Sequence, residues 1–96
     1  MQVDVQYTGP ALVAAANATK LDDYHLHYFL DESAAAYIGT QVPVPMGNPN
    51  IVHTAALQQT FDNVAPGPHT VTVMLSGANH VSVTPPLSAQ VMFTVQ

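Results

Sequence analysis

The stretch YHLHYFLD, residues 24–31, decides the fold, because it predicts a strand with two different faces. Side chains along a strand point alternately to opposite sides. Leu26 and Leu30 therefore lie on one face, and His25 and His27 project from the other. A rigid strand that presents two imidazoles on one face is a favourable beginning for a metal site.

Further strands are predicted on both sides of this segment, from alternating apolar residues and from the turn residues between them. The clearest alternation is in residues 69–75, where Val71 and Val73 face one way and Thr72 and Met74 face the other. The strands that the sequence predicts cover residues 2–7, 11–16, 24–30, 51–55, 58–64, 69–75, 80–84 and 88–95.

These seven or eight short strands, without a convincing helix, indicate an all-β fold. We expect an antiparallel β-sandwich of the immunoglobulin-like or fibronectin III-like kind. In a common arrangement of that kind, the strand 24–30 lies next to the strand 69–75, which also pairs with 88–95. The proline-rich residues 41–50 are expected to form an exposed connection. With no repeat and no linker, residues 1–96 are expected to form a single domain.

The composition argues against several classes of function. Only 7% of the residues are charged, Lys20 is the one basic residue besides histidine, and the formal net charge is -5. A chain with so few basic residues offers no positively charged surface that could bind nucleic acid or an anionic membrane. No apolar run approaches the ~18 residues that suggest a membrane span, so no membrane insertion is expected. Cysteine is absent, which removes disulfide, thiolate-metal and cysteine-nucleophile chemistry.

The neutral polar surface favours a secreted or periplasmic protein. No signal peptide is recognisable after Met1, so we expect an export leader to be absent from this sequence.

Histidine is the residue type that carries the predicted chemistry. Imidazole suits copper, zinc and nickel, and no thiolate competes with it here. Met74 is expected on the strand beside the histidine pair, and a thioether near imidazoles favours copper, especially Cu(I). The alternative is that these are ordinary strand histidines. The predicted metal ligands are His25, His27, His80 and His53, with Met74 as a weaker candidate.

His69 is expected to have a structural role instead. It follows Pro66-Gly67-Pro68, and an aromatic residue at such a corner often anchors the turn by a hydrogen bond to the backbone. Asp31 and Glu32 could hold or orient a metal ligand. Acids at the end of a strand more often only solvate it, and we favour that interpretation.

Four fragments occur in order along the chain: His25-Leu26-His27 with Leu30-Asp31, then His53, then PGPHTV at 66–71, then Asn79-His80 followed by Pro85-Pro86. Together they resemble a family of small secreted bacterial β-sandwich domains that are rich in histidine and of uncharacterised function. The resemblance spans roughly residues 24–95, implies export and a β-sandwich, and supplies no activity. Domains similar to these can accompany copper proteins of the cell envelope.

Enzyme signatures are missing from the sequence. It contains no nucleophile elbow, no glycine-rich phosphate loop and no H-E-x-x-H zinc motif, so we expect no enzymatic activity. We predict an extracytoplasmic metal-binding protein, with copper as the expected ion and zinc as the alternative, that acts in binding, delivery or sequestration. The competing hypothesis is a non-catalytic, immunoglobulin-like structural or interaction module of an envelope or secreted protein. Besides the metal ion, the partners considered are other envelope proteins and a second copy, paired through edge strands.

Overall fold

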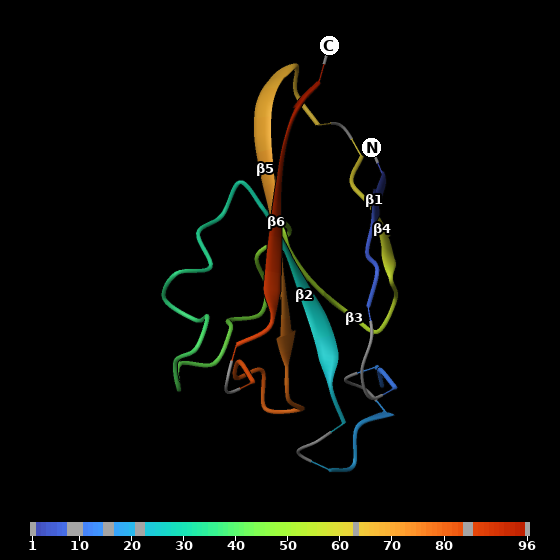
Figure 1. The fold of residues 1–96 in the computed structure, drawn as a ribbon, viewed down its shortest axis with the longest axis vertical. Helices are drawn as coiled ribbons and strands as arrows, with labels where there is room; N and C mark the ends of the chain where they lie inside the picture. The colour runs from blue at the N-terminus through green and yellow to red at the C-terminus, as the bar shows by residue number, and fades with distance from the viewer. Residues whose placement is uncertain are drawn as a thin grey trace.

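The computed structural model describes residues 2–7, 11–14, 17–20, 23–62, 64–83 and 86–95. These residues form six β-strands in two antiparallel sheets (Figure 1). The larger sheet has the strand order β3-β2-β5-β6, and the smaller one pairs β1 with β4. The strands are β1 (Gln2–Asp4), β2 (His25–Leu30), β3 (Ile51–Thr54), β4 (Gln58–Thr60), β5 (Gly67–Ser76) and β6 (Ser88–Val95).

The prediction of an all-β fold with antiparallel sheets is confirmed. The immunoglobulin-like arrangement of seven or eight strands stays a prediction, since the described part of the chain forms six. Residues 11–14 lie in no strand, as the low strand propensity of alanine explains, and residues 15 and 16 lie outside the described residues. Of the expected strand 80–84, residues 80–83 contain only an isolated bridge between Ser82 and Ser76, and residue 84 lies outside the described residues. Among the described residues, no helix has the length and apolar character needed to cross a membrane.

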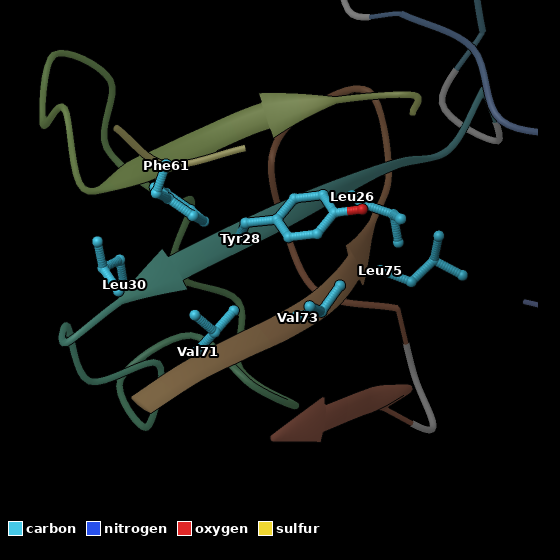
Figure 2. Packing of buried hydrophobic residues seen from close by; sticks show 7 residues of the cluster. All are labelled: Leu26, Tyr28, Leu30, Phe61, Val71, Val73 and Leu75. Atoms are coloured by element: carbon cyan, nitrogen blue, oxygen red, sulfur yellow. The ribbon is translucent and has the colours of Figure 1, made fainter. Parts of the chain in front are cut away.

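β2 lies inside the larger sheet and is buried along its whole length. Its face with Tyr28 packs against the apolar side of β5 and against Phe61 (Figure 2). β1 contributes Val3 and so covers part of this face. Burial of each large apolar side chain contributes roughly 1.5–3 kcal/mol, which makes this the main core. The cluster consists of Leu26, Tyr28, Leu30, Phe61, Val71, Val73 and Leu75.

The opposite face of β2 is covered by the long connection between β2 and β3. In Figure 1 this connection lies on the other side of the central strands from β1 and β4. Its residues Ala34 and Val44 are buried against Phe29 and Met74. Residues 41–50 are therefore not wholly exposed as expected: Val44 is only 3% exposed, because the apolar residues on this face need cover from water.

The register of the strands determines which side chains lie beside His27. Met74 of β5 and His53 of β3 are the residues directly opposite His27 on its two neighbouring strands. The predicted neighbourhood of the histidine strand and the Met74 strand is confirmed, as is the pairing of β5 with β6. Directly opposed residues share a face, so these side chains lie on the side that the β2–β3 connection covers.

Candidate metal centre

His25 and His27 lie on the same face of β2, as the alternation predicts, and both are fully buried at 0% exposure. Their ring centroids are 4.6 Å apart. The burial arises because β2 is an inner strand and because residues 31–50 cover this face. Buried imidazoles need partners for their nitrogens, so what these rings face decides their role.

Two further histidines complete the group. His53 comes from β3, directly opposite His27, and its ring centroid lies 4.3 Å from that of His27. His80 comes from the turn between β5 and β6. That turn is closed by a hydrogen bond of 3.0 Å from the His80 amide to the Gly77 carbonyl. The His80 carbonyl accepts a 2.9 Å hydrogen bond from the Val44 amide, which ties the turn to the covering connection.

The backbone of His80 has a positive φ of +64°. L-residues rarely adopt this left-handed conformation, which costs a residue other than glycine roughly 1–2 kcal/mol. Non-glycine residues held in this conformation cluster at functional sites.

The four rings turn their nitrogens toward a common point. His80 Nδ1 lies 3.3 Å from His25 Nε2, 3.3 Å from His27 Nε2 and 3.1 Å from His53 Nδ1. Each histidine offers one ligand atom, and all these atoms lie within 4.8 Å of one another. The cluster of His25, His27, His53 and His80 could therefore hold a metal ion.

The spacing of these nitrogens can be compared with known coordination geometry. A metal–imidazole bond of about 2.0–2.1 Å gives nitrogens about 3.3 Å apart in a tetrahedron. In a square plane, one of the three neighbours of each nitrogen would lie opposite it, at about 4 Å. His80 Nδ1 has all three neighbours at 3.1–3.3 Å, which matches one apex of a tetrahedron.

Hydrogen bonds alone do not account for these contacts. A nitrogen of a neutral imidazole carries either one proton or one lone pair, so His80 Nδ1 can satisfy only one of its three neighbours. On the outer side, His25 Nδ1 and His53 Nε2 are buried without a hydrogen-bond partner. Each unsatisfied buried group costs about 1–3 kcal/mol. A metal ion would take a lone pair from each inward nitrogen and remove the conflict between them.

Ser76 is a part of the centre that the sequence did not reveal. Its hydroxyl lies 3.0 Å from Nδ1 of His27, and both residues are fully buried. Hydrogen bonds to the outer nitrogen fix the ring orientation and the tautomer of a metal-binding histidine. The alternation of Thr72 and Met74 would have indicated Ser76 if the predicted strand had been extended past residue 75.

The cluster favours neutral imidazoles. Burial lowers the pKa of His25 to about 4, and repulsion by His80 and His53 adds to the shift. Burial lowers the pKa of His27 to about 2, with smaller contributions from the other three histidines. The pKa of His53 is lowered by burial and by His80, while the nearby Pro45 carbonyl opposes the change. Neutral imidazole is the form that binds metal ions.

His69 lies outside the cluster and has oxygen partners. Its Nδ1 is 2.5 Å from a carboxylate oxygen of Asp31, and its Nε2 is 2.6 Å from the carbonyl oxygen of Ala65. Because both oxygens only accept, both nitrogens must donate, which requires the imidazolium. The hydrogen bond to Asp31 raises the pKa of His69, and the bond to Ala65 adds to this. The predicted hydrogen bond from His69 to the backbone of its turn is thus confirmed.

Met74, the remaining predicted ligand, is fully buried beside the cluster. It lies directly opposite His27, and its side chain packs with Phe29 and Val44 in the apolar core of this face. Met92, the methionine on the neighbouring strand β6, does not join Met74. Its side chain is 78% exposed, and it pairs with Thr70, which is four residues along β5 from Met74. The structure thus brings the four predicted histidines together and leaves Met74 in an apolar setting next to them.

Comparisons of the chain with protein families, with curated proteins and with solved structures each found no match.

Proposed function

We propose that this protein binds a single transition-metal ion through His25, His27, His53 and His80. The observation that carries the proposal is the convergence on His80 Nδ1 of three other ring nitrogens at 3.1–3.3 Å. Two costs support it: the left-handed backbone of His80 and the buried outer nitrogens of His25 and His53 both lower stability. Binding of an ion would offset these costs.

Binding, delivery or sequestration fits this centre better than catalysis. Catalytic metal sites in proteins keep one position open for water or substrate, whereas closed sites use all four positions. Here four imidazoles offer four ligand atoms to one ion, and two of these histidines are fully buried.

The competing interpretation is a structural or interaction module whose histidines only hold loops together. Such histidines would pair with backbone carbonyls, as His69 does with Ala65. The inward nitrogens of the cluster face one another instead, which favours the metal-binding proposal.

Copper is the ion that we propose, with zinc as the alternative. Imidazole suits both ions, and among divalent ions a site built from nitrogen ligands generally binds Cu(II) more tightly than Zn(II). We propose that the protein acts outside the cytoplasm. The 7% content of charged residues, which implies a neutral polar surface, supports that location, and the absence of cysteine is compatible with it.

The proposal is tested by titrating the metal-free protein with Cu(I) under reducing, oxygen-free conditions, and separately with Cu(II) and Zn(II). We expect one ion per chain and a higher melting temperature. An ion that binds only the folded state adds about 2.7 kcal/mol at a concentration a hundredfold above its dissociation constant. If none of the ions raises the melting temperature at concentrations far above micromolar, the protein is not a metal-binding protein of this kind.

A further inference from the structure

The histidine cluster has no negative charge beside it among the described residues. None of the described acids belongs to the group of converging ligand atoms. Asp31 is bound to His69 and Thr70, beyond the end of β2 opposite to His25. Asp23 accepts hydrogen bonds from the amides of the turn at residues 19 and 20. The other described acids are Asp4 in β1, Glu32 after Asp31, and Asp62 after β4.

The outer nitrogens of the cluster also lack an acidic partner. His27 Nδ1 contacts the neutral Ser76 hydroxyl, and His25 Nδ1 and His53 Nε2 have no hydrogen-bond partner. Histidines that bind divalent zinc usually donate the outer N–H to a carboxylate, a backbone carbonyl or water. In this centre, neither the ligands nor their outer contacts supply the negative charge that would balance a divalent ion.

Building on the proposed function, we propose that the centre selects a monovalent ion of tetrahedral preference, Cu(I), over divalent ions. The cost of moving an ion from water into a buried site rises with the square of its charge, so it is about fourfold larger for a dication than for a monocation of equal radius. Four neutral ligands offset only part of that free-energy cost. Carboxylates, which offset it in many divalent sites, are absent from the cluster.

The spacing of the nitrogens favours the same ion. The three contacts of 3.1–3.3 Å around His80 Nδ1 match one apex of a tetrahedron, whereas the square-planar arrangement typical of Cu(II) and Ni(II) would place one of the three at about 4 Å. Zn(II) also accepts tetrahedral coordination. Geometry therefore favours Cu(I) over Cu(II), and any preference for Cu(I) over Zn(II) must come from the charge of the ion.

The first test is the ratio of dissociation constants for Cu(I) and Zn(II) on the wild-type protein, each measured by competition with a chelator. Ag(I), in chloride-free buffer, serves as a monovalent ion that does not change oxidation state under these conditions. We expect Cu(I) and Ag(I) each to bind at least tenfold more tightly than Zn(II). If the protein binds Zn(II) more tightly than Cu(I), the proposed selectivity for a monovalent ion is wrong, and the proposed metal-binding function still holds. Absence of binding by every ion removes that function itself.

A matched pair of variants isolates the effect of charge. His80→Asp and His80→Asn both place an oxygen donor at the same position, and both residues tolerate the positive φ of +64°. They have nearly the same shape and differ by one negative charge. We expect the ratio of Zn(II) affinity to Ag(I) affinity to be at least tenfold higher for His80→Asp than for His80→Asn.

Equal ratios for the two variants would show that charge does not set the selectivity, and the proposal would then be wrong. If both variants lose binding, the wild-type ratio alone decides the question.

Discussion

Two histidine environments on the larger sheet differ in what their ring nitrogens face. His69, near the start of β5, directs both nitrogens to oxygen atoms, and its ring stacks on Phe93 with centroids 5.7 Å apart. The rings of His25 and His27 are deeper, and their inward nitrogens face the nitrogen of a third histidine. Burial and repulsion by other histidines of the cluster lower the pKa values of this pair, whereas the carboxylate of Asp31 raises the pKa of His69.

The difference shows how a structural histidine can be told from a binding one. Each region contains one of the two non-glycine residues that have a positive φ in the described part of the chain, Asp31 and His80. At Asp31 the surrounding bonds are complete, because its carboxylate accepts from both His69 and the Thr70 amide. At His80 three nitrogens compete for one partner. Satisfied contacts stabilise the fold alone, whereas the converging nitrogens of the cluster could also hold a metal ion.

The largest expected effect is the loss of metal affinity when the two buried histidines of β2 are replaced. Replacing His25 and His27 together by alanine removes half of the proposed ligands, so we expect the affinity for Cu(I) to fall by more than a hundredfold. His69→Ala is the control: it should leave the affinity unchanged and lower the melting temperature, since it breaks the contacts to Asp31 and Ala65. Chelator competition and thermal unfolding measure the two quantities. Loss of binding in His69→Ala at unchanged stability would reverse the roles assigned to the two regions.

A fall in pH should reduce the stability that depends on His25 and His27 and should preserve the stability that depends on the His69–Asp31 pair. His25 and His27 have lowered pKa values in the fold, of about 4 and about 2, so the unfolded chain takes up their protons more readily. The stability of the metal-free protein should therefore begin to fall as the pH drops below about 6.5 and should lose several kcal/mol by about pH 4. Urea unfolding at a series of pH values measures this loss. A stability that stays level over that range would contradict the lowered pKa values.

The His69–Asp31 pair should stabilise the fold across the same pH range. The raised pKa of His69 gives a contribution that is complete below about pH 6.5 and is lost as the pH rises through the folded value. The pKa of Asp31 is lowered, first by the His69 hydrogen bond and then by that of the Thr70 amide. Its contribution is complete above about pH 3.9 and is lost in stronger acid. His69→Ala should therefore lose more stability at pH 5 than at pH 8.

The sequence predicts the inner strands well, because their alternation is a local property. The faces of β2 and the neighbourhood of Met74 follow from a period of two residues and a common strand order. What covers the histidine face could not be predicted, because Ala34 and Val44 lie in irregular backbone with no period. His80 was a candidate by residue type and by its place in the turn after the Met74 strand, at the sheet end of His25. The direction of its side chain depends on a left-handed backbone conformation that no local pattern specifies.

A smaller effect is expected from Ser76→Ala. The hydroxyl of Ser76 holds Nδ1 of His27 at 3.0 Å, so its removal should free the ring to rotate and weaken metal binding about tenfold. Ser82→Ala is the matched control. Ser82 is also buried, and its hydroxyl bonds to Gly39 and Val83 rather than to a histidine. Equal losses of affinity in the two variants would mean that Ser76 acts through stability alone.

The smallest expected effect concerns the backbone of the turn. His80→Gly and His80→Ala remove the same imidazole, but only glycine adopts a φ of +64° without steric cost. At ordinary loop positions alanine is the more stabilising of the two, because glycine loses more entropy on folding. At residue 80 we expect the order to reverse, with the glycine variant about 1 kcal/mol more stable than the alanine variant in the metal-free state.

Both variants should bind Cu(I) more weakly than the wild type, because each lacks the nitrogen at which the other three converge. Urea unfolding of the two proteins gives the difference in stability. If alanine proves the more stable, the turn relaxes without a ligand, and the left-handed conformation then depends on the His80 side chain. In that case the centre is assembled by its histidines, and the backbone does not hold His80 in place for them.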